Sequence, residues 1–477
     1  MSVRKYLKLF VSFSLGTWIR AIVSFFTTPI ITHLMNPDEF GKSAMYTTAF
    51  GIANMIVLLG TDQTFVRFFC DYEEQKRSKL LWSCLFPSLV VATSLSIALL
   101  VLSDKVALVL YGKAYPYINL LFILNLYVAL FQIYNQLIVR MLKKGVLYSM
   151  IDIIAAASTA VSTIVFALTT SRTFYSIILG NLVGTFLALL VGISQGKEYW
   201  KPTKLTRGEL KSVLGYGLPF MPTGLMFWLF TSMDRIILRQ YSTFEQIGLY
   251  AVAFKVVGIM NLVQTGFVTF WVATAYEKGS NNSDSSMFFV RANEMVSFVM
   301  FLAAFLLLAF KDVVFLLLAR PYRASSMIFP FLLFSPIMYS VSETTVVWIN
   351  FKKKTYWHIV ITAVSALVNY IGNALLVPVY AARGAAISTG VSYMVFFWMR
   401  TVISIRLCPE AGYKLKKMIC ATALMTFAAL VGTFQNSPLV NALIGLSGIP
   451  ITIAIYKESF LVLKDEILIM LRSKSHK

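Results

Sequence analysis

Long apolar segments, each close to the length that crosses a bilayer, recur along the whole chain. Runs such as Leu99–Leu102 and Phe305–Leu308 do not alternate apolar and polar residues, as the strands of a membrane β-barrel would. Because backbone groups in hydrocarbon must be satisfied internally, the segments are predicted to be α-helices. We expect an all-α integral membrane protein with about fourteen spans, near residues 9–34, 45–66, 80–102, 117–138, 146–169, 174–194, 214–238, 250–272, 290–310, 325–349, 357–380, 384–405, 416–434 and 437–456.

The composition is that of a membrane protein, and this changes how the high net positive charge is interpreted. Only 13% of the residues are charged, against roughly 25% in a soluble domain. The net charge of +21 would suggest nucleic acid on a soluble protein, but these cations lie in short loops between spans, so no nucleic-acid partner is expected. The apolar segment after Lys5 is too long for a signal peptide and lacks a small-residue cleavage site, so it is interpreted as the first span.

The loop charges predict an orientation. With the N-terminus in the cytoplasm, 29 of the 42 lysines and arginines lie on the inside and ten on the outside, while three (Arg20, Lys255 and Arg400) lie within spans. Cytoplasmic loops carry the excess of positive charge in membrane proteins. We therefore expect a multi-pass membrane protein with both termini in the cytoplasm.

An internal repeat predicts two related halves. Phe40-Gly41 and Gly51-Ile52-Ala53-Asn54 recur as Ile247-Gly248 and Gly258-Ile259-Met260-Asn261, offset by 207 residues, and a lysine-rich loop follows both the fourth and the tenth span. Six spans separate the copies, so both would insert in the same direction and form two lobes related by an axis along the membrane normal. The predicted domains are an N-terminal six-helix lobe (1–195), a cytoplasmic linker (196–213), a C-terminal six-helix lobe (214–406), and two extra helices with a tail (407–477).

No catalytic motif is visible, and the protein is not expected to be an enzyme. The four cysteines and three histidines lack the spacing of a metal site, so neither a metal nor another cofactor is expected.

Charged residues within spans are the strongest candidates for function. Arg20 lies near the middle of the first span, where an arginine costs roughly 2.5–3.5 kcal/mol on insertion scales. It would either line a wet cavity or form a buried ion pair. Lys255 lies about five residues inside the outer end of its span and would either line the same cavity or reach the interface. Arg400, near an inner end, is expected to reach the interface.

Several further charges could form ion pairs or couple transport to an ion. Asp62, Asp152 and Glu343 lie toward the inner ends of their spans and are candidate counter-ions or proton carriers. Asp234 and Arg235 stand at the outer end of the seventh span, where local pairing or a turn is the simpler account. The spacing of five between Asp62 and Arg67 leaves open whether these two pair.

Sequence blocks across almost the whole chain resemble a known family. The most specific lie at 60–69 and 214–277, and shorter ones mark the eleventh and twelfth spans at Asn369-Tyr370, Leu376-Val377-Pro378 and Gly384-Ala385-Ala386. Together these blocks resemble bacterial polysaccharide-export flippases, the O-antigen (Wzx-type) transporters of the MOP superfamily.

The resemblance implies a V-shaped, MATE-like fold with a central cavity, in which Arg20 and Lys255 match positions of cavity cations. It implies alternating-access transfer of an undecaprenyl-pyrophosphate-linked oligosaccharide, an O-antigen or related repeat unit of lipopolysaccharide, from the cytoplasmic to the periplasmic leaflet. The expected partners are this glycan, membrane lipid and other membrane proteins of polysaccharide assembly. Antiport of H⁺ or Na⁺ would add driving force.

Two other functions are considered. A cation-coupled multidrug exporter shares the fold, but it relies on intramembrane carboxylates, whereas the midplane charge here is Arg20. A membrane polysaccharide polymerase or ligase typically needs a large outside loop, which this chain lacks.

Overall fold

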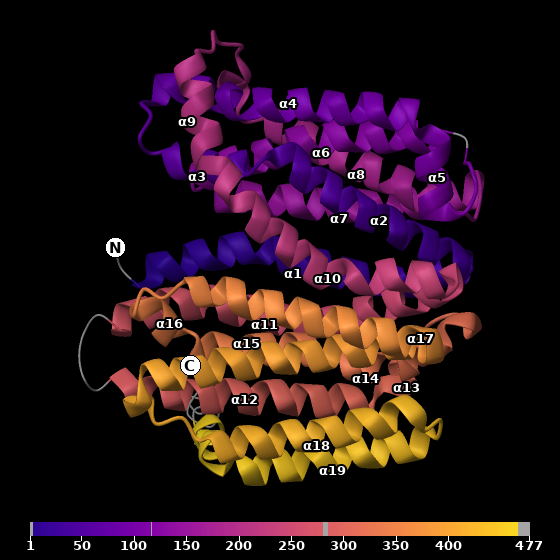
Figure 1. The fold of residues 1–477 in the computed structure, drawn as a ribbon, viewed down its shortest axis with the longest axis vertical. Coiled ribbons are helices and arrows are strands. Elements are labelled where there is room, and N and C mark those ends of the chain that lie inside the picture. Colours follow the sequence, from indigo (N-terminus) through magenta and orange to yellow (C-terminus); the bar gives the residue numbers. More distant parts are fainter. Residues whose placement is uncertain (1–2, 116, 280–284, 466–477) are drawn as a thin grey trace, which may run out of the picture. The chain divides into compact units, whose positions relative to one another are not determined.

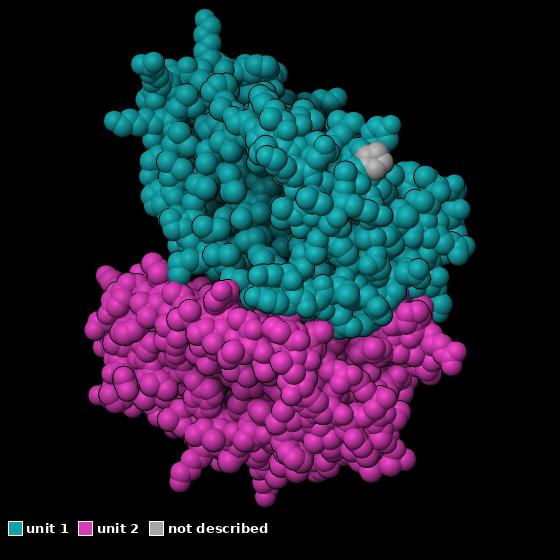
Figure 2. All heavy atoms as spheres, turned by 45° about the vertical axis from the view of Figure 1, so that its right-hand side comes forward, with its two compact units in different colours: residues 1–251 teal, residues 252–477 magenta. Residues whose placement is uncertain are grey.

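The computed structural model describes residues 3–115, 117–279 and 285–465. Every regular element in these residues is a helix, which confirms the predicted fold class. The chain divides into two compact units, residues 1–251 and 252–477 (Figure 2). This division falls within a helix, and the predicted domain boundaries, which follow the sequence repeat, stay predictions.

The first unit contains ten helices in the part that the structure describes (Figure 1). They are α1 (Val3–Leu34), α2 (Pro37–Leu58), α3 (Thr61–Phe68), α4 (Arg77–Val101), α5 (Ser103–Tyr111), α6 (Ile118–Met141), α7 (Gly145–Thr169), α8 (Phe174–Ser194), α9 (Arg207–Gly217) and α10 (Met221–Tyr241), with 3-10 turns η1 (Glu74–Lys76), η2 (Lys197–Trp200) and η3 (Leu218–Phe220). The next helix, α11 (Phe244–Gly279), runs from the first unit into the second.

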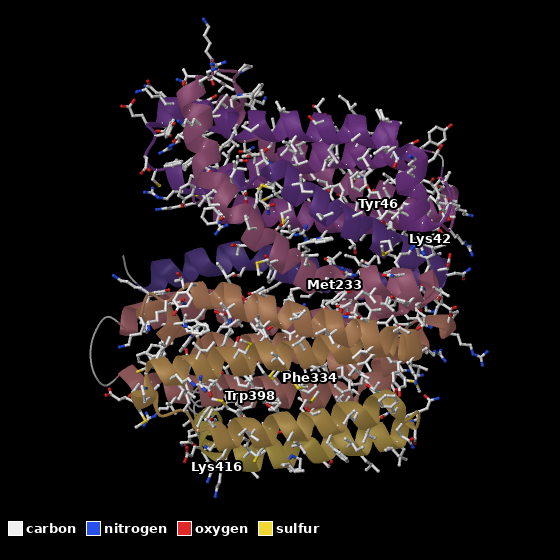
Figure 3. All side chains as sticks on the ribbon, viewed as in Figure 1. Lys42, Tyr46, Met233, Phe334, Trp398 and Lys416 are labelled. Atoms are coloured by element: carbon white, nitrogen blue, oxygen red, sulfur yellow. The ribbon has the colours of Figure 1, made fainter. Side chains whose placement is uncertain are left out.

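The second unit continues α11 with helices that, apart from the short α13, lie at the predicted later spans. They are α12 (Ser285–Ala309), α13 (Lys311–Leu316), α14 (Phe329–Leu332), α15 (Phe334–Thr345), α16 (Val347–Phe351), α17 (Tyr356–Leu407), α18 (Leu415–Phe434) and α19 (Pro438–Ile455), with turns η4 (Arg320–Met327) and η5 (Pro409–Ala411). The side chains on α15 and α17 include Phe334 and Trp398, which Figure 3 labels in this unit.

The described helices are long and apolar enough to form a multi-pass membrane protein. Within the described residues, eleven could cross a bilayer by length and composition, or thirteen if each of two bent pairs forms one span. That count takes α17 as one helix, so the number fourteen stays a prediction.

One bent span lies where the sequence predicted a continuous helix over 45–66. Leu59 and Gly60 both adopt left-handed backbone, with φ of 51° and 70°, and α2 and α3 meet at 52°. A Cβ on Gly60 would lie 2.2 Å from the carbonyl oxygen of Gly217. The break therefore places α3 directly against the end of α9, and only glycine fits at this contact.

The 52-residue helix α17 is a hairpin of two antiparallel halves. Ala381 interrupts it with φ 48° and ψ −126°, which matches the gap predicted between spans at 357–380 and 384–405. The halves are joined by buried hydrogen bonds: Asn373 Nδ2 donates to Ser388 Oγ at 3.1 Å, and that hydroxyl donates to the carbonyl of Asn369 at 2.8 Å. Buried polar groups that bond across helices satisfy one another in hydrocarbon.

The two lysine-rich loops of the predicted repeat share one backbone motif. Lys143 and Lys353 each adopt φ 57°. In both loops the amide of this lysine bonds to the carbonyl three residues earlier, and the next amide bonds to the carbonyl five residues earlier. These bonds form a Schellman motif at the end of a helix. The motif recurs 210 residues apart, close to the offset in the sequence, and supports the repeat.

Helices α18 and α19 belong to the second unit and are tied to it by a buried cation. The side chain of Lys311 is only 1% exposed, although the sequence placed it in an outer loop. Its Nζ donates to the carbonyls of Ser326 at 3.2 Å and Gly432 at 2.9 Å. Gly432 lies in the last turn of α18, where free carbonyls attract a cation. Asn441 of α19 donates to Asp312 Oδ2 beside it, at 3.0 Å.

Candidate functional site

The candidate site in the first unit is centred on Arg20 of α1. Its Nη1 lies 3.7 Å from Oδ1 of Asp152 on α7. The two side chains differ sharply in exposure, at 58% for Arg20 and 6% for Asp152. Arg20 lies within the candidate span Ser14–Leu34. The sequence left two alternatives for Arg20, lining a wet cavity or forming a buried ion pair. The geometry has features of both, because Arg20 pairs with a buried carboxylate while its own guanidinium stays accessible.

A close contact between α1 and α7 sets up this pair. The amide of Gly16 donates to Ser149 Oγ at 2.9 Å, and a Cβ at Gly16 would lie 2.6 Å from the Cα of Ser149. Arg20 and Asp152 follow these residues by four and three positions, so they lie one turn further along the same faces. The glycine permits the approach that brings the guanidinium to the carboxylate.

A third helix reaches the same carboxylate. Gln136 of α6 donates its Nε2 to Asp152 Oδ1 at 2.9 Å. Sequence analysis missed Gln136, although its position near the end of a predicted span offered a signal. With a hydrogen bond from Gln136 and the charge of Arg20 nearby, the buried Asp152 charge is compensated without enclosing Arg20.

Lys255, the second predicted cavity cation, lies on α11 in the second unit with an exposed side chain. It thus belongs to a different compact unit from Arg20. Its role in binding stays a prediction.

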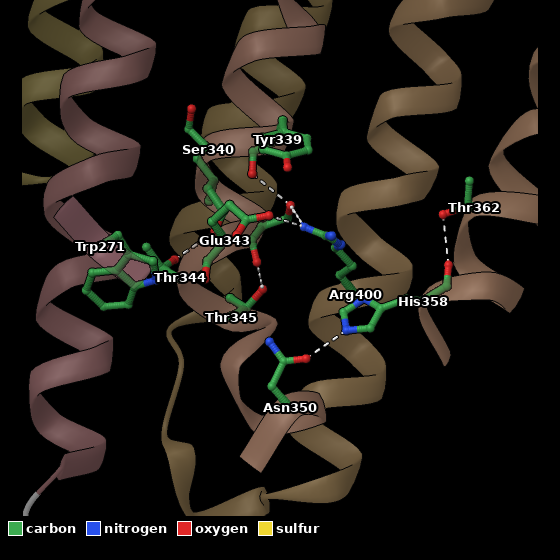
Figure 4. A network of polar contacts seen from close by, with 12 residues as sticks. Trp271, Tyr339, Ser340, Glu343, Thr344, Thr345, Asn350, His358, Thr362 and Arg400 are labelled. Carbon is green, nitrogen blue, oxygen red and sulfur yellow. Dashed lines mark hydrogen bonds and ion pairs between the residues drawn. The ribbon is translucent and has the colours of Figure 1, made fainter. Parts of the chain in front are cut away.

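In the second unit, Glu343 of α15, a predicted candidate counter-ion, pairs with Arg400 of α17, a partner that the sequence did not predict. Arg400 Nη1 lies 2.6 Å from Glu343 Oε1, with side-chain exposures of 11% and 13% (Figure 4). The same nitrogen donates to Ser342 Oγ at 3.0 Å, and the guanidinium lies 4.3 Å from the ring centroid of Phe396. The expectation that Arg400 reaches the interface is therefore wrong, because a carboxylate and an aromatic ring hold it inside the unit.

The neighbourhood of this pair is polar and well connected (Figure 4). Trp271 Nε1 donates to the backbone carbonyl of Glu343 at 2.9 Å, and a ring nitrogen of His358 lies 2.7 Å from Asn350 Oδ1. These bonds fix the segment that carries Glu343. They indicate an ordered structural network around the pair.

Asp62 and Arg67 both lie on α3, and the structure gives each a different contact. Arg67 Nη1 pairs with Asp71 Oδ2 at 2.9 Å, four residues on, and Gln63 Nε2 donates to Asp62 Oδ2 at 2.6 Å. Arg67 and Asp71 are both more than half exposed. The question left open by their spacing is thus resolved for Arg67, whose ion-pair partner is Asp71.

Asp234 and Arg235 lie inside α10, which continues to Tyr241. The simpler account of a turn at this point is therefore wrong. The carboxylate of Asp234 is buried and accepts a hydrogen bond of 2.6 Å from the hydroxyl of Tyr250, at the start of α11. Arg235 is half-buried. Asp234 thus joins two consecutive helices within the first unit.

The described residues contain no group of three or more histidine, cysteine or acidic side chains that could hold a metal ion. All four cysteines are free thiols. The chemistry available at the candidate site is therefore that of hydrogen bonding and charge, with Arg20 as the accessible cation.

Comparison with solved structures places this fold among membrane transporters. The lipid II flippase MurJ, in an inward closed conformation, superposes with a TM-score of 0.71 at 14% identity over 94% of this chain and 99% of that one. A multidrug resistance MATE family transporter of the MOP superfamily gives 0.55 at 15% identity over 84% and 97%, and a Vibrio cholerae MATE transporter gives 0.57 at 15% over 84% and 98%. These likenesses confirm the MATE-like fold.

Among curated proteins, no sequence matches this chain. A family profile does match it, over residues 7–276, which is more than half of its length. The matched region contains Arg20, Asp152, the sequence block at 60–69 and all but the last residue of the block at 214–277. The protein therefore belongs to the polysaccharide biosynthesis protein family.

Proposed function

We propose that this protein is a flippase that moves an undecaprenyl-pyrophosphate-linked oligosaccharide from the cytoplasmic to the periplasmic leaflet of the bacterial inner membrane. Family membership supports a role in polysaccharide assembly, and the fold supports transport. The glycan would be an O-antigen or a related repeat unit. Transfer would proceed by alternating access, with both termini in the cytoplasm.

The observation that carries the proposal is the exposed guanidinium of Arg20 inside an apolar span. An arginine facing lipid there would cost several kcal/mol, whereas one facing a water-filled passage would not. Its contact with Asp152, at 3.7 Å, is an ion pair longer than a hydrogen bond, and a guanidinium has five N–H donors. The remaining donors suit the two charges of a pyrophosphate diester, which planar guanidinium groups bind well.

The driving force is compatible with this substrate. With the inside negative, moving two negative charges outward gains about 4.6 kcal/mol per 100 mV. A coupled H⁺ or Na⁺ would add to this force. Lys255, which the resemblance matches to a cavity cation, would be a second cation for the head group.

The same fold in MATE transporters makes a multidrug exporter the second candidate. A multidrug exporter that transports cations would need an intramembrane carboxylate that can bind those cations. Here Asp152 and Glu343 each pair with an arginine. That arrangement favours an anionic substrate.

A deletion strain tests the proposal. We expect undecaprenyl-linked repeat units to accumulate inside the cell and surface glycan to disappear, with unchanged drug susceptibility. Complementation with wild type should restore the glycan, Arg20→Ala should not, and Arg20→Lys should restore it in part, because lysine keeps the charge without the planar geometry. Arg172→Ala is the matched control, since Arg172 is an exposed cation in a loop of the same unit.

Two results would overturn the proposal. One is normal surface glycan with Arg20→Ala present at wild-type amounts. The other is a deletion strain with normal glycan and raised drug susceptibility, which would favour the exporter.

A further inference from the structure

An apolar cavity of about 390 Å³ lies within the first unit, apart from the Arg20 site. Its walls come from α2, α4, α5 and α6 and consist mostly of aliphatic and aromatic side chains, among them Ile56, Leu99, Val109 and Phe122. Such a cavity in a membrane protein accommodates hydrocarbon more readily than water, because water needs several polar partners. Its form and lining indicate a site for an alkyl chain.

One wall carries a buried hydroxyl that lacks a hydrogen-bond partner. Tyr111, at the end of α5, lines the cavity and is 4% exposed. Among the described residues nothing hydrogen-bonds its hydroxyl. An unsatisfied buried hydroxyl costs about 1–3 kcal/mol, so such a group calls for an explanation. Because the oxygen itself is buried, a head group in the cavity would not reach it, and the hydroxyl instead lowers the stability of the wall.

The wall also carries one cation, Lys105 of α5, which is exposed. The adjacent Asp104 accepts a bond from Ser103 Oγ at 3.4 Å, and consecutive residues on a helix do not face each other. The polar residue Asn119 lines the cavity as well, but its Nδ2 already donates to the carbonyl of Ser103 at 3.2 Å. Lys105 is thus the group on this wall that could bind an anionic head.

We propose that this cavity binds an anionic phospholipid, with one acyl chain among the apolar walls and the phosphate near Lys105. Charge complementarity favours an anionic head group, because a basic residue at the membrane surface attracts it. The cavity is too small for a whole undecaprenyl chain. The site would hold a structural lipid that braces α5 against α2, α4 and α6.

Native mass spectrometry of the purified full chain tests this proposal without any transport assay. The probes are phosphatidylglycerol, phosphatidylcholine with the same acyl chains, and undecaprenyl phosphate. We expect one phosphatidylglycerol to be retained in preference to phosphatidylcholine. Lys105→Ala should weaken its retention about fivefold, while Lys105→Arg should preserve it.

Two further variants separate the head-group contacts from the chain contacts. Ala49→Leu adds bulk at a partly buried position of the cavity wall and should reduce retention of both phospholipids. Tyr111→Phe should raise the melting temperature of lipid-free protein, because it removes an unsatisfied hydroxyl, and should leave the preference for phosphatidylglycerol unchanged, because that hydroxyl does not reach the cavity. Lys113→Ala is the control, since Lys113 is another exposed lysine nearby that lies 5.0 Å from the ring centroid of Tyr115.

The proposal is overturned if phosphatidylglycerol and phosphatidylcholine are retained equally, or if Lys113→Ala weakens retention as much as Lys105→Ala. Preferential retention of undecaprenyl phosphate that Ala49→Leu abolishes would also overturn it, since the cavity would then hold substrate. None of these results bears on Arg20, so the flippase function is tested separately.

Discussion

Arg20 and Asp152 form an ion pair whose partners are unequal, because the arginine is largely exposed and the aspartate is buried. Removing the two side chains should therefore have different effects. Arg20→Ala leaves a buried carboxylate with Gln136 as its remaining donor, which should cost about 1–3 kcal/mol of unfolding free energy. Asp152→Asn leaves an accessible guanidinium and should cost less.

The double variant Arg20→Ala/Asp152→Asn should recover most of the stability lost in Arg20→Ala, and thermal unfolding in detergent measures all three. If the flippase hypothesis is correct, the double variant remains inactive despite its recovered stability. Equal losses from both single variants would contradict the unequal burial.

Glu343 and Arg400 offer the contrasting case, because both side chains are nearly buried. Neutralising either residue leaves the other as an unpaired charge inside the second unit. Glu343→Gln and Arg400→Gln should therefore each lower the unfolding free energy by about 3–5 kcal/mol. The double variant should cost less than the sum. A double-mutant cycle on thermal unfolding measures this coupling, and additive effects would show that the pair contributes nothing.

Much of the fold could be predicted because hydrocarbon imposes a simple pattern. The helices α6, α7 and α8 begin and end within three residues of the predicted spans, since apolar length sets their limits. The short helices α5, α9 and α13 were missed. In α9 the signal was present, because Thr206 and Glu209 form a capping box, but the segment was interpreted as a linker.

The sequence could predict which charged residues belong to the candidate site, but not which of them pair with one another. An arginine in the middle of an apolar span points to a partner or to water. Which carboxylate pairs with it depends on how closely two helices approach, and that depends on the contact of Gly16 with Ser149. Arg400 shows the same limit: its position near a helix end suggested the interface, whereas α15 supplies Glu343 beside it.

The contact between α3 and α9 predicts a sharp difference between two nearby glycines. A Cβ on Gly217 would lie 2.9 Å from the carbonyl of Leu59 and 3.0 Å from that of Gly60, while a Cβ on Gly215 would meet nothing within 4 Å. Gly217→Ala should therefore lower the melting temperature, by an amount corresponding to about 1–3 kcal/mol. Gly215→Ala should be neutral or stabilising, because alanine favours a helix over glycine. Similar melting temperatures for the two variants would argue against the close contact.

The left-handed lysines of the repeated loops predict a gain in stability. A non-glycine residue in this conformation carries a backbone strain of about 1–2 kcal/mol. Lys143 and Lys353 both carry this strain, at the same position of a Schellman motif. Lys143→Gly and Lys353→Gly should each raise the unfolding free energy by about 1 kcal/mol. Lys144→Gly is the control. Lys144 has φ −82°, which is not left-handed, so a glycine there removes no backbone strain and should not raise the unfolding free energy. Because the two motifs lie in separate units, their effects should add in the double variant, as thermal unfolding can measure. A destabilised Lys143→Gly would mean that contacts of the lysine side chain outweigh its backbone strain.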